Sequence, residues 1–331
     1  MPTEIDLDAA TARLAGVARR TPVLRSRLLD ETLGAEIHLK AEHLQHTGAF
    51  KFRGAFNAIA ALDSNIRARG IITYSSGNHA QAVARAAQIF RVPATVVMPN
   101  DAPSSKRQAT ESYGATIVTY DRFRERREDI AEAILAEQHF TLIPPFDHPD
   151  VIAGQSTCAR ELFEDSGPLD QLIVSVGGGG LISGSALAAH EANPKCRIVG
   201  VEPESGNDVQ LSLQQGRIVE IDVPDTIADG QQTTSPGKHT FAVMQQHVDE
   251  IVTVTDDQIL DGVDYLFRFQ KQVAEPSGAC ALAAILANKV NVDGSRVGVI
   301  ISGGNISPER FFELMEPRWK NERPSAIHDR R

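Results

Sequence analysis

The sequence predicts an α/β protein with two open, twisted, mostly parallel sheets, and three observations support this prediction. Short apolar runs alternate with helical patterns between residues 71 and 143. A proline-rich segment, IPPFDHP at 143–149, then interrupts all regular structure. A second series of apolar runs and helical patterns extends from 172 to 302. Strands that alternate with helices form parallel sheets with covered faces, so each series predicts one sheet.

The first series consists of closely spaced strand–helix–strand units. Each strand is short and apolar, and each is followed by a helix, which is the pattern of a parallel sheet. The expected strands are 71–74, 94–98 and 115–119, and the expected helices are 78–89, 103–113 and 124–137.

The second series is longer, and other segments flank it. Residues before about 65 show helical patterns and one extended segment at 21–24, and they could join either sheet. The stretch 224–238 is typical of an ordered surface loop, and the charged stretch 317–331 is predicted to fray. The expected strands are 172–176, 197–201, 251–254 and 297–302, and the expected helices are 181–190, 256–270 and 277–288.

The composition argues against several classes of protein. Of the 331 residues 42% are hydrophobic and 23% charged, which is ordinary for a soluble globular protein. The net charge of −10 argues against nucleic acid or an anionic membrane as a partner. No apolar stretch approaches the length of a membrane span, and the acidic start does not resemble a signal peptide. Three widely spaced cysteines suit a reducing compartment, so we expect a cytoplasmic protein.

Lys51 is the most informative residue of the chain. It lies in the run TGAFKFRG at 47–54, between two phenylalanines and ahead of an apolar helical pattern. Burial disfavours the charged form of a lysine, which can then act as a nucleophile near neutral pH. Such an amine forms a Schiff base with an aldehyde cofactor such as pyridoxal phosphate. The alternative is a surface lysine whose stem covers the core.

Glycines follow one predicted strand of the second series, in the run VGGGGL at 176–181. In open parallel sheets ligands bind beyond the carboxyl ends of the strands. Successive glycines let backbone N–H groups surround an anion, and the start of a helix adds positive potential. The run therefore predicts a phosphate site. A flexible tight turn is the alternative, although it does not explain four glycines in succession.

Two further loops follow predicted strands. The run SSGNH at 75–79 offers hydroxyls, an amide and free N–H groups, which suit a carboxylate; an ordinary helix cap is the alternative. The run SGGN at 302–305 places a hydroxyl at a strand end, with room for a flat ring above the glycines. A plain glycine-rich turn explains this second run equally well.

Together, these motifs resemble those of fold-type II pyridoxal-phosphate enzymes, and most closely those of the serine/threonine dehydratase and serine racemase group. Their order and spacing agree from about Thr21 to Ile306. The resemblance implies a tryptophan synthase β-like fold with the active site in the cleft between two lobes. It also implies a homodimer, a large cofactor-binding domain of residues 1–65 and 148–331, and a small mobile domain of residues 66–147.

The resemblance also implies a role for individual residues. Lys51 would hold the cofactor and act as the base at Cα, and Phe50 would pack beside the ring. Asn78 would hydrogen-bond the ring hydroxyl, and Ser302 would contact the pyridine nitrogen. The phosphate would be bound by the backbone N–H groups of Gly177, Gly178, Gly179, Gly180 and Leu181.

The reaction implied is a β-elimination. A 3-hydroxy amino acid (serine, threonine or 3-hydroxyaspartate) would lose water by elimination, and hydrolysis of the resulting enamine or imine would take up one water and give a 2-oxo acid and ammonia. A neutral serine at the pyridine nitrogen makes the cofactor a weaker electron sink, which favours prompt loss of a β-substituent. The substrate carboxylate would lie in the loop formed by Ser75, Ser76, Gly77, Asn78 and His79.

Other activities remain as alternatives. Ser76 matches the opposite-face acid/base of serine racemases, so a serine or aspartate racemase is one alternative. A dinucleotide-binding oxidoreductase is a distant one, because the third glycine of its fingerprint is replaced by Ile182 or Ser183. An inactive homologue that binds a metabolite is disfavoured by the intact Lys51 and Ser76.

Two further sites are expected. The run VEPESGND at 201–208 brings carboxylates and backbone carbonyls together, which suits a hard cation, although a solvated acidic loop is the default reading. The resemblance implies a divalent-cation site of Glu202, the Gly206 carbonyl and Asp208, with Mg²⁺ favoured over Ca²⁺ or Mn²⁺. Arg127 matches an arginine near the substrate in serine racemase, and a guanidinium there could bind a second carboxylate of 3-hydroxyaspartate.

Overall fold

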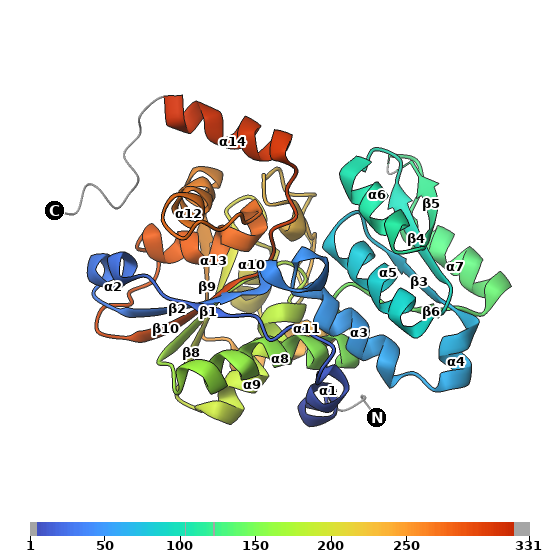
Figure 1. Ribbon diagram of the computed structural model, residues 1–331, viewed down its shortest axis with the longest axis horizontal. Helices are drawn as coiled ribbons and strands as arrows, with labels where there is room; N and C mark the ends of the chain where they lie inside the picture. Colours follow the sequence, from blue (N-terminus) through green and yellow to red (C-terminus); the bar gives the residue numbers. More distant parts are fainter. Residues whose placement is uncertain (1–4, 103, 122, 321–331) are drawn as a thin grey trace.

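The computed structural model describes residues 5–102, 104–121 and 123–320, and these residues form two sheets (Figure 1). The larger sheet has six strands, of which five are parallel. Its edge strand is antiparallel to its neighbour. In spatial order the strands are β1 (Val23–Leu24), β2 (Glu36–Ala41), β10 (Arg296–Ile301), β7 (Gln171–Ser175), β8 (Arg197–Pro203) and β9 (Glu250–Val254).

Helices cover both faces of the larger sheet, as alternate residues of one strand show. Ile173 of β7 belongs to a core shared with α12 and α13, whereas Leu172 and Val174 belong to a core shared with α8 and α9. The helices of this part are α1 (Leu7–Leu14), α2 (Arg27–Leu33), α3 (Lys51–Ala61), α8 (Pro149–Ser166), α9 (Gly180–Ala192), α10 (Asp208–Gln215), α11 (Lys238–His247), α12 (Asp256–Arg268), α13 (Pro276–Leu286) and α14 (Pro308–Lys320), with short 3₁₀ turns η1 (Glu42–Leu44), η2 (His46–Gly48) and η3 (Asp229–Gln231).

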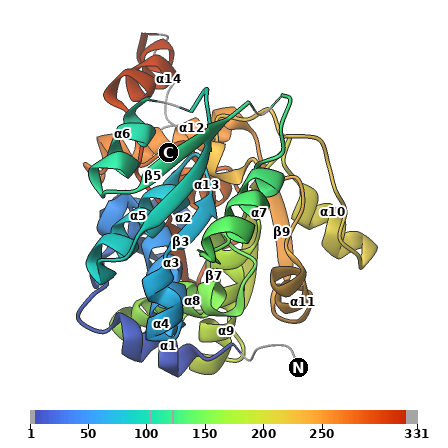
Figure 2. The ribbon, with the colours of Figure 1, turned by 90° about the vertical axis from the view of Figure 1, so that its right-hand side faces the viewer.

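The smaller sheet has four parallel strands and faces the viewer in Figure 2. Val96 and Met98 of its second strand pack against one helix, and Val97 packs on the opposite face, so both faces are covered. The strands in spatial order are β5 (Thr116–Tyr120), β4 (Ala94–Pro99), β3 (Ile71–Tyr74) and β6 (Thr141–Leu142), and the helices are α4 (Ser64–Arg69), α5 (Asn78–Phe90), α6 (Ser104–Ser112) and α7 (Arg127–Gln138).

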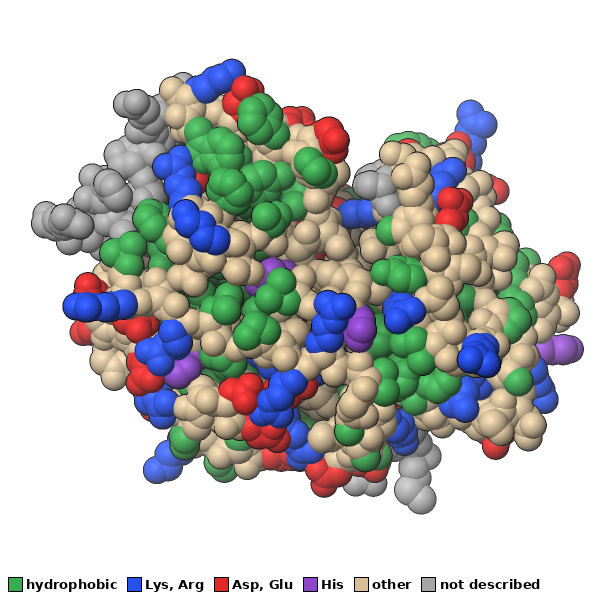
Figure 3. All heavy atoms as spheres, viewed as in Figure 1, with side chains coloured by type: hydrophobic (Ala, Val, Ile, Leu, Met, Phe, Trp, Pro, Cys, Tyr) green, Lys and Arg blue, Asp and Glu red, His purple; other side chains and the backbone are tan. Residues whose placement is uncertain are grey.

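Helix α3 lies between the two sheets and packs closely on α8 and α5 (Figure 1). Glycines permit this approach, because a Cβ on Gly154 of α8 would lie 2.6 Å from the carbonyl oxygen of Arg53. Figure 3 shows that the surface is notched between the part built on the larger sheet and the part built on the smaller sheet. The residue at the start of α3, Lys51, therefore lies near the junction of the two parts.

A network of buried charges holds α3 in its place against the larger sheet and α8. The Arg53 guanidinium is fully buried and donates to both carboxylate oxygens of Glu42, at 2.8 Å each. It also donates to both oxygens of Glu161, at 2.7 and 2.8 Å, and Lys40 donates to Glu161 at 2.7 Å. Burial is the largest single influence on the pKa of Glu42 and would raise it, but the charge and hydrogen bonds of Arg53, with smaller contributions from Thr21 and Lys40, together hold that pKa below its ordinary value.

The predicted fold class is confirmed, and each expected strand overlaps an observed one. Strands β2 and β6 and helices α8, α10, α11 and α14 were not predicted from the sequence. The prediction that the chain frays from residue 317 is wrong for 317–320, which complete α14, and its remainder lies outside the described residues. Residue 103, the expected start of a helix, also lies outside them. None of the described helices is long and apolar enough to cross a membrane.

Candidate active site

Lys51 begins α3, and its amine lies against the segment that crosses from one sheet to the other. Its Nζ donates a hydrogen bond to the carbonyl oxygen of Pro145 at 2.7 Å and lies 5.2 Å from the centroid of the Phe50 ring. Burial lowers the pKa of the Lys51 amine from 10.5 to about 8. A substantial share of this amine is therefore neutral and nucleophilic just above neutral pH, as the sequence predicted.

The loop before Lys51 is joined to the loop after β10. Ala49 forms an isolated bridge with Gly303, the Phe50 N–H donates to the Ser302 carbonyl at 3.0 Å, and the Gly304 N–H donates to the Gly48 carbonyl at 2.9 Å. The Ser302 hydroxyl is buried and lies 3.4 Å from the carbonyl oxygen of Ser277. Two of the predicted motifs thus meet, although they lie far apart in the sequence.

The four glycines connect β7 to α9 and form a backbone cradle. Gly179 has φ +91, a conformation that side chains disfavour, and a Cβ on Gly178 would overlap the Phe146 ring. Among the described residues, no hydrogen bond is donated by the backbone N–H groups of Gly177, Gly178, Gly179 or Gly180. Free N–H groups at the start of a helix are the donors that a phosphate requires.

Neighbouring segments hold the cradle in place. The Thr240 hydroxyl of α11 donates to the Gly178 carbonyl at 2.8 Å. Asp147, beside Phe146, accepts from the N–H groups of Lys238, His239 and Thr240 at 2.9, 2.8 and 3.2 Å. The crossing segment, the start of α11 and the glycine loop are therefore joined to one another.

The Ser75–His79 loop connects β3 to α5, on the side of the smaller sheet. The Ser75 hydroxyl accepts from the Gly77 N–H at 3.2 Å, and the first N–H groups of α5 have no partner within the helix. The His79 ring lies 3.0 Å from the Ile143 carbonyl, and burial and then Lys51 lower its pKa to about 3. The ring is neutral and bound elsewhere, which leaves the backbone N–H of His79 for the predicted substrate contact.

Asn78 connects the two sides of the site. Its Nδ2 donates to the Glu275 carboxylate at 2.5 Å, and its Oδ1 accepts from Asn305 at 2.8 Å. No role for Glu275 or Asn305 was foreseen from the sequence. Asn305 ends the SGGN run, which was a usable signal, whereas an acid at the start of a helix, where Glu275 stands, is too common to attract notice.

Arg127 begins α7 and lies over Tyr74, the residue before the Ser75–His79 loop. The carbon of its guanidinium is 4.9 Å from the centroid of the Tyr74 ring, and its Nε donates to Glu128 at 2.8 Å. The side chain of Arg127 is 46% exposed, so its remaining N–H groups can reach a ligand. The structure therefore brings this cation next to the predicted carboxylate loop.

The acidic loop after β8 holds two buried carboxylates. Glu202 accepts from the N–H groups of Val209 and Gln210 at 3.1 and 2.9 Å, whereas neither carboxylate oxygen of Asp208 has a hydrogen-bond partner. Burial raises the pKa of Asp208 to about 7, and burial and then Asp208 raise the pKa of Glu202. Unpartnered buried carboxylates fit a hard cation. No group of three or more histidine, cysteine or acidic residues suited to a metal occurs among the described residues.

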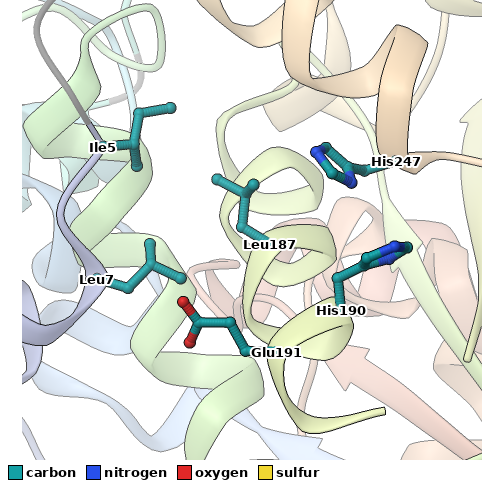
Figure 4. Close-up of a pocket in the computed structure, with 6 residues that line it drawn as sticks. All are labelled: Ile5, Leu7, Leu187, His190, Glu191 and His247. Atoms are coloured by element: carbon teal, nitrogen blue, oxygen red, sulfur yellow. The ribbon is translucent and has the colours of Figure 1, made fainter. Parts of the chain in front are cut away.

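A separate hollow of about 400 Å³ lies at the opposite end of α9 (Figure 4). It is lined by Ile5, Leu7, Leu187, His190, Glu191 and His247. The two histidine rings meet edge to face at 5.0 Å, and His190 lies ten residues, roughly 15 Å, along α9 from the glycine loop. This hollow is therefore distinct from the site at Lys51.

The residues at Lys51 fit pyridoxal phosphate. The glycine N–H groups without partners suit its phosphate, and the Lys51 amine suits its aldehyde. The Asn78 amide and the Ser302 hydroxyl offer polar contacts for its ring. Gly178 cannot carry a side chain, because a Cβ there would overlap the Phe146 ring, so the glycine loop and the crossing segment stay in close contact.

The chain is similar to known proteins over most of its length. The chain is 51% identical to an L-threo-3-hydroxyaspartate ammonia-lyase from Pseudomonas sp. over 94% of this chain and 98% of that protein. It is 48% identical to a serine racemase from Schizosaccharomyces pombe over 95% of this chain and 98% of the relative. Among solved structures, a threonine deaminase of T.th. has a TM-score of 0.86 at 44% identity, over 91% of this chain and 97% of that one. Residues 14–303 match the family model described as pyridoxal-phosphate dependent enzyme, and the chain belongs to this family.

Proposed function

We propose that the protein is a pyridoxal-phosphate-dependent ammonia-lyase that converts a 3-hydroxy amino acid into a 2-oxo acid and ammonia. The observation that carries the proposal is the Lys51 amine, with a pKa near 8, beside a cradle of free glycine N–H groups. Ammonia-lyases that match nearly the whole chain support it. Among the possible substrates we favour 3-hydroxyaspartate, whose product would be oxaloacetate.

The chemistry divides between cofactor and protein. When bound, pyridoxal phosphate supplies a sink for the electrons that remain at the substrate Cα after proton removal. Lys51 would hold the cofactor through its aldehyde and, once the substrate amine has replaced it, take the Cα proton. Ser302 would offer a neutral partner to the pyridine nitrogen, and the N–H groups of the glycine loop would hold the phosphate.

Residues at the edge of the smaller sheet would orient the substrate. The N–H groups and hydroxyls of the Ser75–His79 loop would hold the α-carboxylate, and Ser76 would face the substrate on the side opposite Lys51. We propose that residues 66–147 move as a unit over the site and exclude water during elimination. Water must then enter, because hydrolysis releases the ammonia.

The proposal is tested by the products. Purified protein loaded with pyridoxal phosphate is incubated with L-threo-3-hydroxyaspartate, L-serine and L-threonine, and 2-oxo acid and ammonia are measured. Equal amounts of both products are expected, with 3-hydroxyaspartate the best substrate. Ser76 and the serine racemase relative favour racemase as the second candidate. Inverted amino acid without ammonia would replace our proposal by that one.

We expect Arg127→Ala to impair 3-hydroxyaspartate far more than serine. A hydrogen bond to a charged group contributes about 1.5–3 kcal/mol, so KM for the dicarboxylate should rise about 10- to 100-fold. Serine has no second carboxylate, and its KM should change less than about threefold. Steady-state kinetics with both substrates measure the difference, and the adjacent exposed Arg126→Ala is the matched control. Equal changes for the two substrates would contradict the assignment of Arg127.

We further propose that Glu202, the Gly206 carbonyl and Asp208 hold a divalent cation, with Mg²⁺ favoured over Ca²⁺ or Mn²⁺. The support is the pair of buried carboxylates, of which Asp208 lacks any hydrogen-bond partner. Without a cation, a raised carboxyl pKa means that the folded state binds more protons than the unfolded state between pH 3.8 and about 7. The stability of the metal-free protein should therefore fall as the pH rises through this interval.

We expect Mg²⁺ to raise the melting temperature more at pH 8 than at pH 6. Protons compete with the cation for Asp208, and a carboxyl with a pKa of about 7 lowers the affinity about tenfold between these pH values. Asp208→Asn should abolish the effect, whereas the exposed neighbouring Glu204→Gln should retain it. Thermal shifts in Mg²⁺ titrations at both pH values provide the measurement. A shift that Asp208→Asn retains in full would place the cation elsewhere.

The homodimer and the cytoplasmic location remain predictions.

A further inference from the structure

Glu275 lies directly before α13, and its carboxyl group is enclosed by the site. The residue is only 2% exposed. Its Oε1 accepts from Asn78 at 2.5 Å, and a Cβ on Gly303 would overlap this same oxygen. Its Oε2 is buried and has no hydrogen-bond partner. The carboxyl group thus lies between two segments that bound the expected position of the cofactor ring.

The Asn78 amide is held from two sides. Glu275 accepts a hydrogen bond from Nδ2, and Asn305 donates to Oδ1 at 2.8 Å. Asn305 is itself fixed, since its Nδ2 also donates to the Thr47 carbonyl at 2.6 Å. If the amide were flipped, an oxygen would face the carboxylate and an NH₂ group would face another donor, so both hydrogen bonds would be lost.

We infer that Glu275 is a positioning residue, which orients the Asn78 amide so that its second Nδ2 proton is available to the ring hydroxyl of the cofactor. The inference rests on the proposed function. An amide NH₂ has two protons, and Glu275 accepts a hydrogen bond from one of them, which leaves the other free to donate. Glu275 therefore acts on cofactor binding through Asn78.

The charge on Glu275 depends on its surroundings. Burial, followed by Asp229 of η3, raises its pKa to about 8, while Lys106 of α6 and the hydrogen bond from Asn78 oppose this rise. Lys106 and Asp229 form an ion pair with each other, so their combined influence is small. Either form of the carboxyl group can accept from Asn78, but ionisation above pH 8 strengthens the bond and places a negative charge beside the ring.

A double-mutant cycle tests this inference. Cofactor Kd is measured for the wild type, Glu275→Ala, Asn78→Ala and the double variant by fluorescence titration. We expect Glu275→Ala to raise Kd about tenfold in the wild-type background, as one lost hydrogen bond implies, and less than about twofold in the Asn78→Ala background. Equal effects in the two backgrounds would mean that Glu275 acts independently of Asn78, and would overturn the inference.

Conservative and control variants separate positioning from folding. Glu275→Gln retains an acceptor for Asn78 and should bind the cofactor within about threefold of the wild type. The absorbance of the wild-type bound cofactor should change with a midpoint near pH 8, and this change should be absent in Glu275→Gln. Asp264→Asn changes another buried carboxyl group, whose hydrogen-bond partners are Arg268 and Trp319 and not residues of the site, and it should leave both readouts unchanged.

The outcomes also distinguish this inference from the proposed function. If Glu275→Ala does not fold, Glu275→Gln provides the test, and a cofactor Kd that rises about tenfold or more in that variant overturns the inference. A wild-type protein that binds pyridoxal phosphate and releases ammonia, but gives an additive cycle, refutes the role of Glu275 alone. A wild-type protein that binds no pyridoxal phosphate refutes the proposed function.

Discussion

Lys51→Ala is expected to abolish both the absorbance band of lysine-bound cofactor and the release of ammonia. Alanine removes the amine that bonds the aldehyde and the base that takes the Cα proton. Proton transfer by a positioned side chain alone contributes about 10²–10⁴-fold, and loss of the covalent attachment adds to this. Activity should therefore fall by about 10⁴-fold or more.

The measurement needs a control for the loss of a lysine as such. Lys289→Ala removes an exposed lysine and should leave band and activity unchanged. The melting temperature of metal-free, cofactor-free Lys51→Ala should stay near that of the wild type, because removing an amine from a partly buried position does not strand a partner charge. A Lys51→Ala protein that keeps the band and releases ammonia at the normal rate would refute the assignment of Lys51.

Arg53→Ala is expected to have the largest effect on stability. The change leaves Glu42, which is fully buried, without the guanidinium that neutralises it, and it leaves a cavity beside α3. Removal of one member of a buried ion pair costs about 3–5 kcal/mol, which is a large part of the stability of an ordinary domain. Chemical denaturation and thermal melting measure the loss.

Arg25→Ala is the matched control for Arg53→Ala. Arg25 also pairs with two carboxylates, those of Asp30 and Glu36, but its side chain is 41% exposed. Exposed ion pairs contribute about 0–1 kcal/mol, so this variant should be nearly as stable as the wild type. If the two variants were equally stable, the buried network would not support α3 in the way we describe.

Much of the fold could be predicted because its strands are short apolar runs between clear helical patterns. Strand β2 was missed for a physical reason, although it is an inner strand of the larger sheet, next to the edge strand β1. Its residues include His38 and Lys40, which are buried yet polar, and Lys40 is neutralised by Glu161 from a distant helix. Local pattern cannot reveal such a partner. Helix α8 was missed because Pro149 was interpreted as part of a break, whereas it occupies the first turn of the helix, where proline is favoured.

The residues of the site also fall into two groups, those that the sequence predicted and those that it did not. Apart from Phe50, Lys51 and Arg127, which lie at the starts of helices, its predicted residues lie at or near the ends of strands, where glycines, hydroxyls and amides are unusual enough to be noticed. Other contributors carry no local signal: the acceptor for Lys51 is a backbone carbonyl of Pro145, and Glu275 resembles an ordinary helix start. Only the meeting of segments far apart in the sequence reveals their position. The roles of Ser76 and Arg127 stay predictions until kinetics test them.

The crossing between the two sheets constrains how the protein can open. Phe146 and Asp147 are fastened to the glycine loop and to α11, so a hinge cannot lie in these residues without disturbing the anion cradle. If the smaller sheet moves as we propose, the moving unit predicted as residues 66–147 would end before Phe146, and the pivot would lie in residues 143–145, which include two prolines. The carbonyl of Pro145 also accepts from Lys51. With such a movement, the glycine loop would stay in place while the Pro145 carbonyl shifts relative to the Lys51 amine, and product release would then be coupled to the hydrogen bonding of that amine.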